Sequence, residues 1–286
     1  MSVNVTTSFV EQYSANVQML SQQMGSKLRG AVDVESIKGK NAFFEQIGKV
    51  TAQLRTSRHG TTPQIDTPHS RRRLNTATYE WADLIDDADK IRMLIDPTSS
   101  YAKAAAAAMG RAMDSVIISA ALGSSDTGVS GGTSVALPST QKIAHGSAGL
   151  TVAKLLSAKK ILDENDVDPS IKRYCVVSPE QIEDLLNLTE VKSSDFNTVK
   201  ALAQGDINSF LGFEFITSNL LTQDATPNRQ VIAFAADGIK LGIGKDITAK
   251  ISERDDKSYS TQVYYCMDLG ATRMEEEKVV EIACQE

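Results

Sequence analysis

The stretch DPTSSYAKAAAAAMGRAMDSVIISAALG, residues 96–123, contains the clearest helix signal in the sequence. Asp96 can cap this helix, Pro97 suits its first turn because proline lacks an N–H, and Gly123 ends it. At ~1.5 Å per residue, a helix over 97–122 is a rod of roughly 38 Å. Its five consecutive alanines let a neighbouring backbone approach closely, which suits a helix that crosses a sheet. High helix propensity alone explains the alanines equally well.

The residues before this helix predict a long hairpin with little of its own to pack against. Segments 43–55 and 72–82 are rich in threonine, aromatic and β-branched residues, which is typical of strands. Between them, residues 56–70 are polar and contain Gly60, Pro63 and Pro68, so they predict a flexible tip. A two-stranded ribbon is marginally stable alone, which makes another subunit a candidate partner. Further upstream, residues 6–24 predict a helix with one narrow apolar stripe, of the kind that docks on another surface.

The residues after the helix alternate between helix and strand signals. Residues 123–149 are rich in glycine and serine and predict a surface loop or short hairpin. Thr151 then caps a helix, residues 174–177 form a short apolar strand, and Ser178-Pro-Glu-Gln181 is a capping box that opens a second helix. Strands follow at 210–218 and 230–235, which indicates a compact α/β domain over 150–245. The chain then returns to strands at 247–253, 260–267 and 279–284.

The composition is that of an ordinary soluble globular protein. The 286 residues include 30 Lys and Arg against 36 Asp and Glu, a net charge of −6 that argues against a dedicated nucleic-acid binder. The N-terminus does not resemble a signal peptide, and charges interrupt the most apolar stretch, 104–122, which predicts no membrane span. The widely spaced Cys175, Cys266 and Cys284 predict three small buried apolar side chains in a reducing compartment.

The sequence motifs do not point to catalysis, a cofactor or a metal. The sequence contains no phosphate loop, dinucleotide fingerprint or nucleophile elbow. The acidic run 163–168 lacks the glycine and the final acid of a calcium loop, so we expect a solvated helix end there. His59, His69 and His145 form no metal-binding pair, and a Cys–His nucleophile has no support. We therefore expect a protein without enzymatic activity, cofactor or bound metal.

Charge is segregated along the chain. Residues 49–73 hold six basic residues against one acid, whereas residues 253–286 hold nine acids against four bases. Oppositely charged segments at opposite ends of a chain can meet within one molecule or between copies, where they set register and encounter. A solvated hairpin face or a phosphate-binding patch would also account for the arginines.

Five strings in this sequence carry a resemblance to a known family. The strings are DTPHSRR at 66–72, WADLIDDADK at 81–90, IDPTSSY at 95–101, GDINSFLGFEFITS at 205–218 and GATRMEEEK at 270–278. They resemble those of the podovirus-type major capsid proteins of tailed bacteriophages. The order of hairpin, alanine-rich helix, α/β domain and closing strands is also similar to that family, whose fold is shared with herpesvirus capsid floors and encapsulins. The resemblance spans about residues 40–286 and implies an α+β fold.

The resemblance implies five regions: an N-terminal arm (1–39), an extended β-hairpin loop (40–86), a peripheral domain (87–149) with spine helix 97–122, an axial domain (150–245), and closing peripheral strands (246–286). It also implies that the extended loop lies across the neighbouring subunit. The loop residues expected to contact that neighbour are Arg55, Arg58, Arg71, Arg72 and Arg73. The expected acidic partners are Asp255, Asp256, Glu275, Glu276 and Glu277.

The implied function is that of a structural subunit that self-assembles, as hexamers and pentamers, into an icosahedral shell around double-stranded DNA. The implied partners are copies of the chain, separate scaffolding, portal and decoration proteins, and packaged DNA touched non-specifically on the inner face, without a membrane. The implied location is the virion, with assembly in the host cytoplasm. Residues 51–74 contain no lysine, so the lysine cross-link of some relatives is not expected. An encapsulin-type shell, a small α/β enzyme using 150–245 and a nucleic-acid binder using the hairpin are the alternatives.

Overall fold

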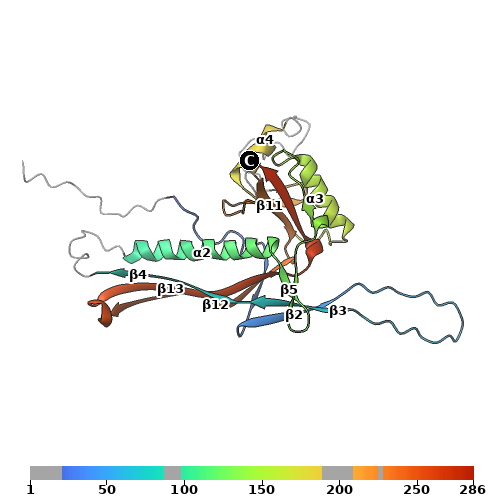
Figure 1. Cartoon of the computed structure of the whole chain (residues 1–286), viewed down its shortest axis with the longest axis horizontal. Coiled ribbons are helices and arrows are strands. Elements are labelled where there is room, and N and C mark those ends of the chain that lie inside the picture. The colour runs from blue at the N-terminus through green and yellow to red at the C-terminus, as the bar shows by residue number, and fades with distance from the viewer. Residues whose placement is uncertain (1–20, 87–97, 189–208, 225–227) are drawn as a thin grey trace, which may run out of the picture.

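The first part of the molecule is a long antiparallel ribbon with a helix lying on one of its faces (Figure 1). The computed structural model describes residues 21–86, 98–188, 209–224 and 228–286. Strands β12 (Ile239–Arg254) and β13 (Ser260–Arg273) pair along their lengths, with β4 (Ala77–Ile85) antiparallel to β13 and β1 (Asp33–Ser36) parallel to β12. Helix α2 (Thr98–Leu122) lies along one face of this sheet. Met109, Met113 and Ile117 of α2 share a core with Met267 and Leu269 of β13.

A six-stranded sheet forms the second part, in the order β7-β14-β11-β8-β10-β9. Its strands are β7 (Lys142–Ile143), β8 (Arg173–Val177), β9 (Ser209–Phe210), β10 (Phe213–Thr217), β11 (Asn228–Ala235) and β14 (Val279–Gln285). Helices α3 (Val152–Glu164) and α4 (Pro179–Asn187) lie beside it (Figure 1). Both predicted helix starts are confirmed, because Thr151 Oγ1 accepts from the Lys154 N–H and Gln181 Oε1 accepts from the Ser178 N–H.

A small third sheet carries the hairpin. Strands β2 (Asn41–Ile47) and β3 (His69–Asn75) pair antiparallel. On its other edge β3 pairs with the short strand β5 (Ser125–Thr127), which in turn pairs with β6 (Thr133–Val135). Residues 48–68 between β2 and β3 contain no strand and project from the body of the molecule (Figure 1). The predicted strands 43–55 and 72–82 are therefore partly wrong: the first is shorter, and the second is divided at Thr76 between two sheets.

Two glycines explain this division, because they let the chain cross from one sheet to the other. Gly242 of β12 and Gly270 of β13 lie directly opposite each other. A Cβ added at Gly270 would lie 2.0 Å from the Asn75 carbonyl oxygen. One at Gly242 would lie 1.9 Å from Ile37 Cδ1 and 3.0 Å from Leu74 Cδ2. The fully buried Leu74 thus occupies a gap in the ribbon that side chains larger than hydrogen would fill.

Arg273, at the end of β13, ties the helix end to the surrounding strands. Its side chain is fully buried, and its guanidinium donates to Ala121 O at 2.9 Å, Gly123 O at 2.7 Å and Val135 O at 3.0 Å. The first two carbonyls belong to the C-terminal end of α2, where backbone oxygens lack partners within the helix. The Arg273 guanidinium therefore supplies hydrogen-bond donors to the carbonyl oxygens at the end of α2, and it also holds the end of β6 in place.

Asp114 fastens the N-terminal part of the described chain onto α2. The carboxylate is fully buried and accepts hydrogen bonds from Gln23 Nε2, Ser26 Oγ, Lys27 N and Leu28 N. Residue 110 must be glycine here, because an added Cβ would lie 2.3 Å from the carbonyl carbon of Gly25. The helix predicted over 6–24 lies outside the described residues up to residue 20, and over 21–24 the prediction is wrong, because those residues are not helical.

The last strand corrects the predicted order of regions. The sequence predicts segment 279–284 among the closing strands of the peripheral domain, but β14 pairs with β11 and β7 within the six-stranded sheet.

Helix α2 bears on the prediction that the chain contains no membrane span. By length and composition alone, residues 100–122 are long and apolar enough to cross a bilayer. Half of the most apolar window of that helix is nevertheless buried against the rest of the chain, as in a core helix.

Candidate functional site

The projecting hairpin loop is the most exposed feature of the described chain. Ile47 is 70% exposed and Leu54 is 89% exposed, and Arg55 and Arg58 are exposed beside them. Within the loop, Arg55 Nε donates to the Ser57 carbonyl oxygen at 2.9 Å, which orders the turn but leaves the charge at the surface. A loop that presents aliphatic and cationic side chains together is suited to a protein surface that is apolar and acidic.

The arginines at the base of the hairpin are held within their own chain. Arg71 forms an ion pair with Glu45 of the paired strand, lies 5.4 Å from the centre of the Phe43 ring, and donates to the Val129 carbonyl oxygen. Arg73 is half-buried, and its side chain lies where a Cβ on Gly131 would be. These contacts fix the sheet β2-β3-β5-β6 to itself.

Arg72 and Glu276, expected to contact different copies, pair with each other in one copy. Arg72 Nη2 lies 2.5 Å from Glu276 Oε2, and its Nε donates to the Met274 carbonyl oxygen at 2.9 Å. Both side chains are nearly buried, 10% and 12% exposed. In the single chain, β3 passes next to the 3-10 turn η4 (Glu276–Lys278) and brings the opposite charges together. A contact of these two residues with a neighbouring copy stays a prediction.

The other acidic residues divide between two places. Asp255 and Asp256 lie in the 3-10 turn η3 (Asp255–Lys257) at the tip of the long ribbon, where Arg254 pairs with Asp256 at 2.8 Å and lowers the pKa of that carboxyl. Glu275 and Glu277 instead line a groove of about 530 Å³ between the hairpin base and the end of α3. The structure therefore separates the predicted acidic segment into a ribbon tip and a groove rim.

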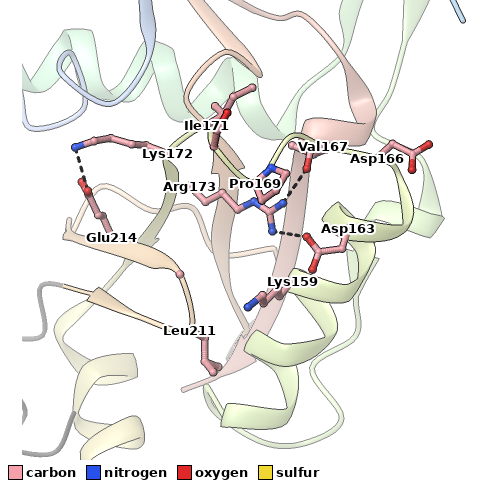
Figure 2. A pocket seen from close by; sticks show the side chains of 12 residues that line it. Lys159, Asp163, Asp166, Val167, Pro169, Ile171, Lys172, Arg173, Leu211 and Glu214 are labelled. Atoms are coloured by element: carbon pink, nitrogen blue, oxygen red, sulfur yellow. Dashed lines mark hydrogen bonds and ion pairs between the residues drawn. The ribbon is translucent and has the colours of Figure 1, made fainter. Parts of the chain in front are cut away.

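A hollow of about 820 Å³ lies on the α/β part of the chain (Figure 2). Arg173 of β8 points into it and pairs with Asp163 of α3 at 2.7 Å, while its Nη2 donates to the Val167 carbonyl oxygen. At its edge, Lys172 and Glu214 pair at 3.1 Å. The pairs Arg173–Asp163 and Lys172–Glu214 neutralise their own charges and brace the loop between α3 and β8.

A cluster of hydrogen bonds around the Glu286 carboxylate closes one end of the six-stranded sheet. Glu286 accepts two hydrogen bonds from Arg229, each 2.7 Å, and others from Gln181 and Gln223. The Arg229 guanidinium lowers the pKa of Glu286 to about 2. Sequence reading missed this cluster because its members come from four separate segments of the chain.

The Glu286 cluster predicts a defined loss of stability in acid. A carboxyl with an ordinary pKa of 4.5 in the unfolded chain and about 2 in the folded chain binds its proton more readily when unfolded. Its contribution is complete above pH 4.5 and disappears as the pH falls through 2. We expect Glu286→Gln to lower the urea midpoint at pH 7, and the difference from wild type to shrink progressively toward pH 2. A difference that is independent of pH would contradict this assignment.

The described residues contain three thiols and no cluster of metal-binding side chains. Within residues 21–86, 98–188, 209–224 and 228–286, no three His, Cys, Asp or Glu side chains gather as a metal site would require. The three cysteines are unpaired and buried, as the sequence predicts. Burial raises the pKa of Cys175 and raises that of Cys284 to about 12.

Comparison with known proteins places this fold. A family model described as phage capsid protein matches residues 5–286. The chain is similar to the capsid structure of the cyanophage P-SCSP1u, at 19% identity and TM-score 0.78, over 100% of this chain and 96% of that chain. It is also similar to the Mycobacterium phage Che8 structure, at 18% identity and TM-score 0.74, over 96% of this chain and 97% of that chain.

A third similar structure is the acid-stable capsid of the Helicobacter pylori bacteriophage KHP30, at 10% identity and TM-score 0.76, over 100% of this chain and 98% of that chain. At these identities the solved structures show a shared fold, and they confirm the predicted α+β architecture of tailed-phage capsid proteins. No curated protein sequence matches this chain. The family match over nearly the whole length means that this chain belongs to the phage capsid protein family and is a subunit of a phage shell.

Proposed function

We propose that copies of this chain join through the projecting hairpin loop, residues 48–68, to form hexamers and pentamers of an icosahedral shell around double-stranded DNA. The observation that supports this most is the exposure of Leu54, at 89%, beside the cations Arg55 and Arg58. Burying such a side chain against another copy contributes about 2 kcal/mol, which repeated contacts multiply over a shell. The acidic ribbon tip at Asp255 and Asp256 is the proposed receiving surface.

The proposed division of the chain follows from this role. The arm (1–39) and the extended loop (40–86) reach neighbouring copies, the peripheral region (87–149, with 246–278) forms the flat wall, and the axial region (150–245) faces the capsomer centre. Strand β14 adds to the axial sheet. The proposed partners are separate scaffolding, portal and decoration proteins, with DNA touched non-specifically on the inner face and no membrane. The proposed role is structural, in the virion, after assembly in the host cytoplasm, and without catalysis or cofactor.

Charge reversal in the hairpin loop tests the proposed contact. The double variant Arg55→Glu, Arg58→Glu is expected to remain folded, because both side chains are exposed, and to produce no closed shells by negative-stain microscopy. The matched control is Lys160→Glu, an exposed charge on α3 that is 72% exposed, which should leave shell yield unchanged.

A compensating reversal tests the receiving surface. Adding Asp255→Arg and Asp256→Arg to the hairpin variant should restore shells if the two surfaces meet, because the attraction is then rebuilt with exchanged signs. Shells of normal yield from the hairpin variant alone would contradict the role of the loop charges. Failure of the compensating variant, with the hairpin variant still inactive, would instead contradict the choice of Asp255 and Asp256.

A further inference from the structure

Cys266 differs from the other two cysteines in its surroundings. Cys175 and Cys284 lie in the main hydrophobic core, where burial raises the pKa of both thiols. Cys266 lies in β13, and Lys245 Nζ donates to its Sγ at 2.9 Å. That hydrogen bond lowers the pKa of the Cys266 thiol. Thiols become reactive when cations stabilise the thiolate, so Cys266 is the reactive one of the three.

The position of Cys266 in the sheet places it on the face away from α2. Side chains alternate along β13, and Met267 and Leu269 belong to the core that α2 covers. Cys266 shares the opposite face with Tyr264, whose hydroxyl donates to Glu80 of β4. Figure 1 shows α2 on only one side of this sheet. Cys266 is 5% exposed, and its sulfur accepts a hydrogen bond from the flexible side chain of the exposed Lys245. The Tyr264 hydroxyl is also within hydrogen-bonding reach of the thiol.

A bulge in β12 brings the lysine to the thiol. The pairing of β12 with β13 shifts on both sides of Lys245, so that Thr248 lies opposite Cys266 and Lys245 lies opposite Asp268. The bulge is fixed from outside the sheet, because Asp246 accepts two hydrogen bonds from Arg29. Bulges of this kind redirect a side chain relative to the regular ladder. Here the redirected amine belongs to one strand and the sulfur to the next.

We propose that Cys266 and Lys245 form an oxidation-dependent sulfenamide cross-link that joins β13 covalently to β12. In the first step the thiolate sulfur attacks one oxygen of a peroxide, the O–O bond breaks, and the released hydroxide takes up a proton as water. The sulfur has then lost two electrons and is a sulfenic acid. In the second step the deprotonated Lys245 Nζ attacks this sulfur, the S–N bond forms, the S–O bond breaks, and the hydroxyl leaves as water with a proton from nitrogen.

The cross-link would stabilise the part of the ribbon beyond it. Residues 246–265 form the closed loop, which includes η3 and the turn residues Ser258 and Tyr259. Both of these have positive φ, 52° and 60°, a conformation that costs free energy in residues other than glycine. Joining Lys245 to Cys266 restricts this loop in the unfolded chain, as a disulfide does, and so favours the folded tip.

Mass spectrometry of the purified full-length protein tests the cross-link. After titration with hydrogen peroxide, the wild type is expected to yield a species about 2 Da lighter than the reduced protein, since the two steps remove two hydrogens in total. Proteolytic digestion should give one linked peptide pair containing Lys245 and Cys266, and dithiothreitol should return the reduced mass. Cys175 and Cys284 serve as internal references and should remain reduced over the same titration.

Two lysine variants separate this cross-link from simple thiol oxidation. Lys245→Arg keeps the positive charge but should abolish the linked peptides, and Cys266 should proceed to the sulfinic acid. Lys250→Arg alters a lysine on the same strand that makes no hydrogen bond to Cys266 in the structure, and should retain the cross-link. The proposal would be overturned if the wild type gave no linked peptides or if Cys266 stayed reduced throughout the titration. It would also be overturned if the Lys245→Arg variant gave an equally abundant cross-link to Cys266.

Discussion

Replacing Arg273 with methionine is expected to destabilise the subunit by about 3–5 kcal/mol. Methionine keeps much of the apolar stem, so the change mainly removes the guanidinium. The carbonyl oxygens of Ala121, Gly123 and Val135 then lose their donor, and the Ala121 oxygen loses it in a buried position. Glu276 loses its 3.8 Å ion pair with Arg273 but keeps the closer pair with Arg72, so most of the loss falls on the end of α2 and on β6. Calorimetry of the unassembled subunit should show a melting temperature lower by roughly 10 °C.

The control for Arg273→Met is the same substitution at an exposed arginine of the same ribbon. Arg254 pairs with Asp256, but its side chain is 42% exposed and water screens the interaction. We expect Arg254→Met to melt close to the wild-type temperature. If Arg273→Met also melted close to wild type, the buried guanidinium would not be what holds the helix end to the strands.

Alanine at Gly270 is the second change from which we expect a large effect. The added methyl group would lie 2.0 Å from the Asn75 carbonyl oxygen and 2.9 Å from its carbonyl carbon, and backbone cannot move aside as a flexible side chain can. The crossing from β3 to β4 must then shift away from the ribbon, which also displaces the buried Leu74. We expect a cost of about 3 kcal/mol, at the upper end of the range for overpacking, and a loss of shells, because the hairpin loop is aimed by this crossing.

Gly30→Ala is the matched control, since no heavy atom lies within 4 Å of the position that its Cβ would occupy. The melting temperature and the shell yield should both stay near wild type in this variant. Equal melting temperatures for Gly270→Ala and Gly30→Ala would show that the strand crossing tolerates a side chain.

Local signals in the sequence predicted most of the regular elements. Gly123 follows directly after the observed end of α2 at Leu122, and Thr151 and the Ser178-to-Gln181 box cap the next two helices. Each of these signals acts within about one helical turn, so neighbouring residues contain all the information that they need. The exposed hairpin loop was also predicted, because its polar residues, glycine and prolines have too few apolar side chains to form a core.

The partners of strands and of charges could not be predicted in this way. The segment 72–82 has one continuous strand signal, yet it serves two sheets because Gly242 and Gly270 leave room for Leu74 and Asn75 to cross. The contact of Arg72 with another copy stays a prediction, whereas its partner within the chain, Glu276, is 204 positions away and could not be read from the sequence. Charge counts along a sequence show that opposite charges exist, but not whether one fold already pairs them.

The sequence by itself determined the helices, most strands, the family and the exposed loop, because caps, periodicity and turn residues act over a few positions. Only the tertiary structure decided which strands pair, where Arg273 and Asp114 are buried, and which charges pair within the chain. It also decided that Cys266 accepts a hydrogen bond from a lysine amine. The physical reason is that pairing and burial depend on residues hundreds of positions apart, whose contacts exist only after the chain has folded.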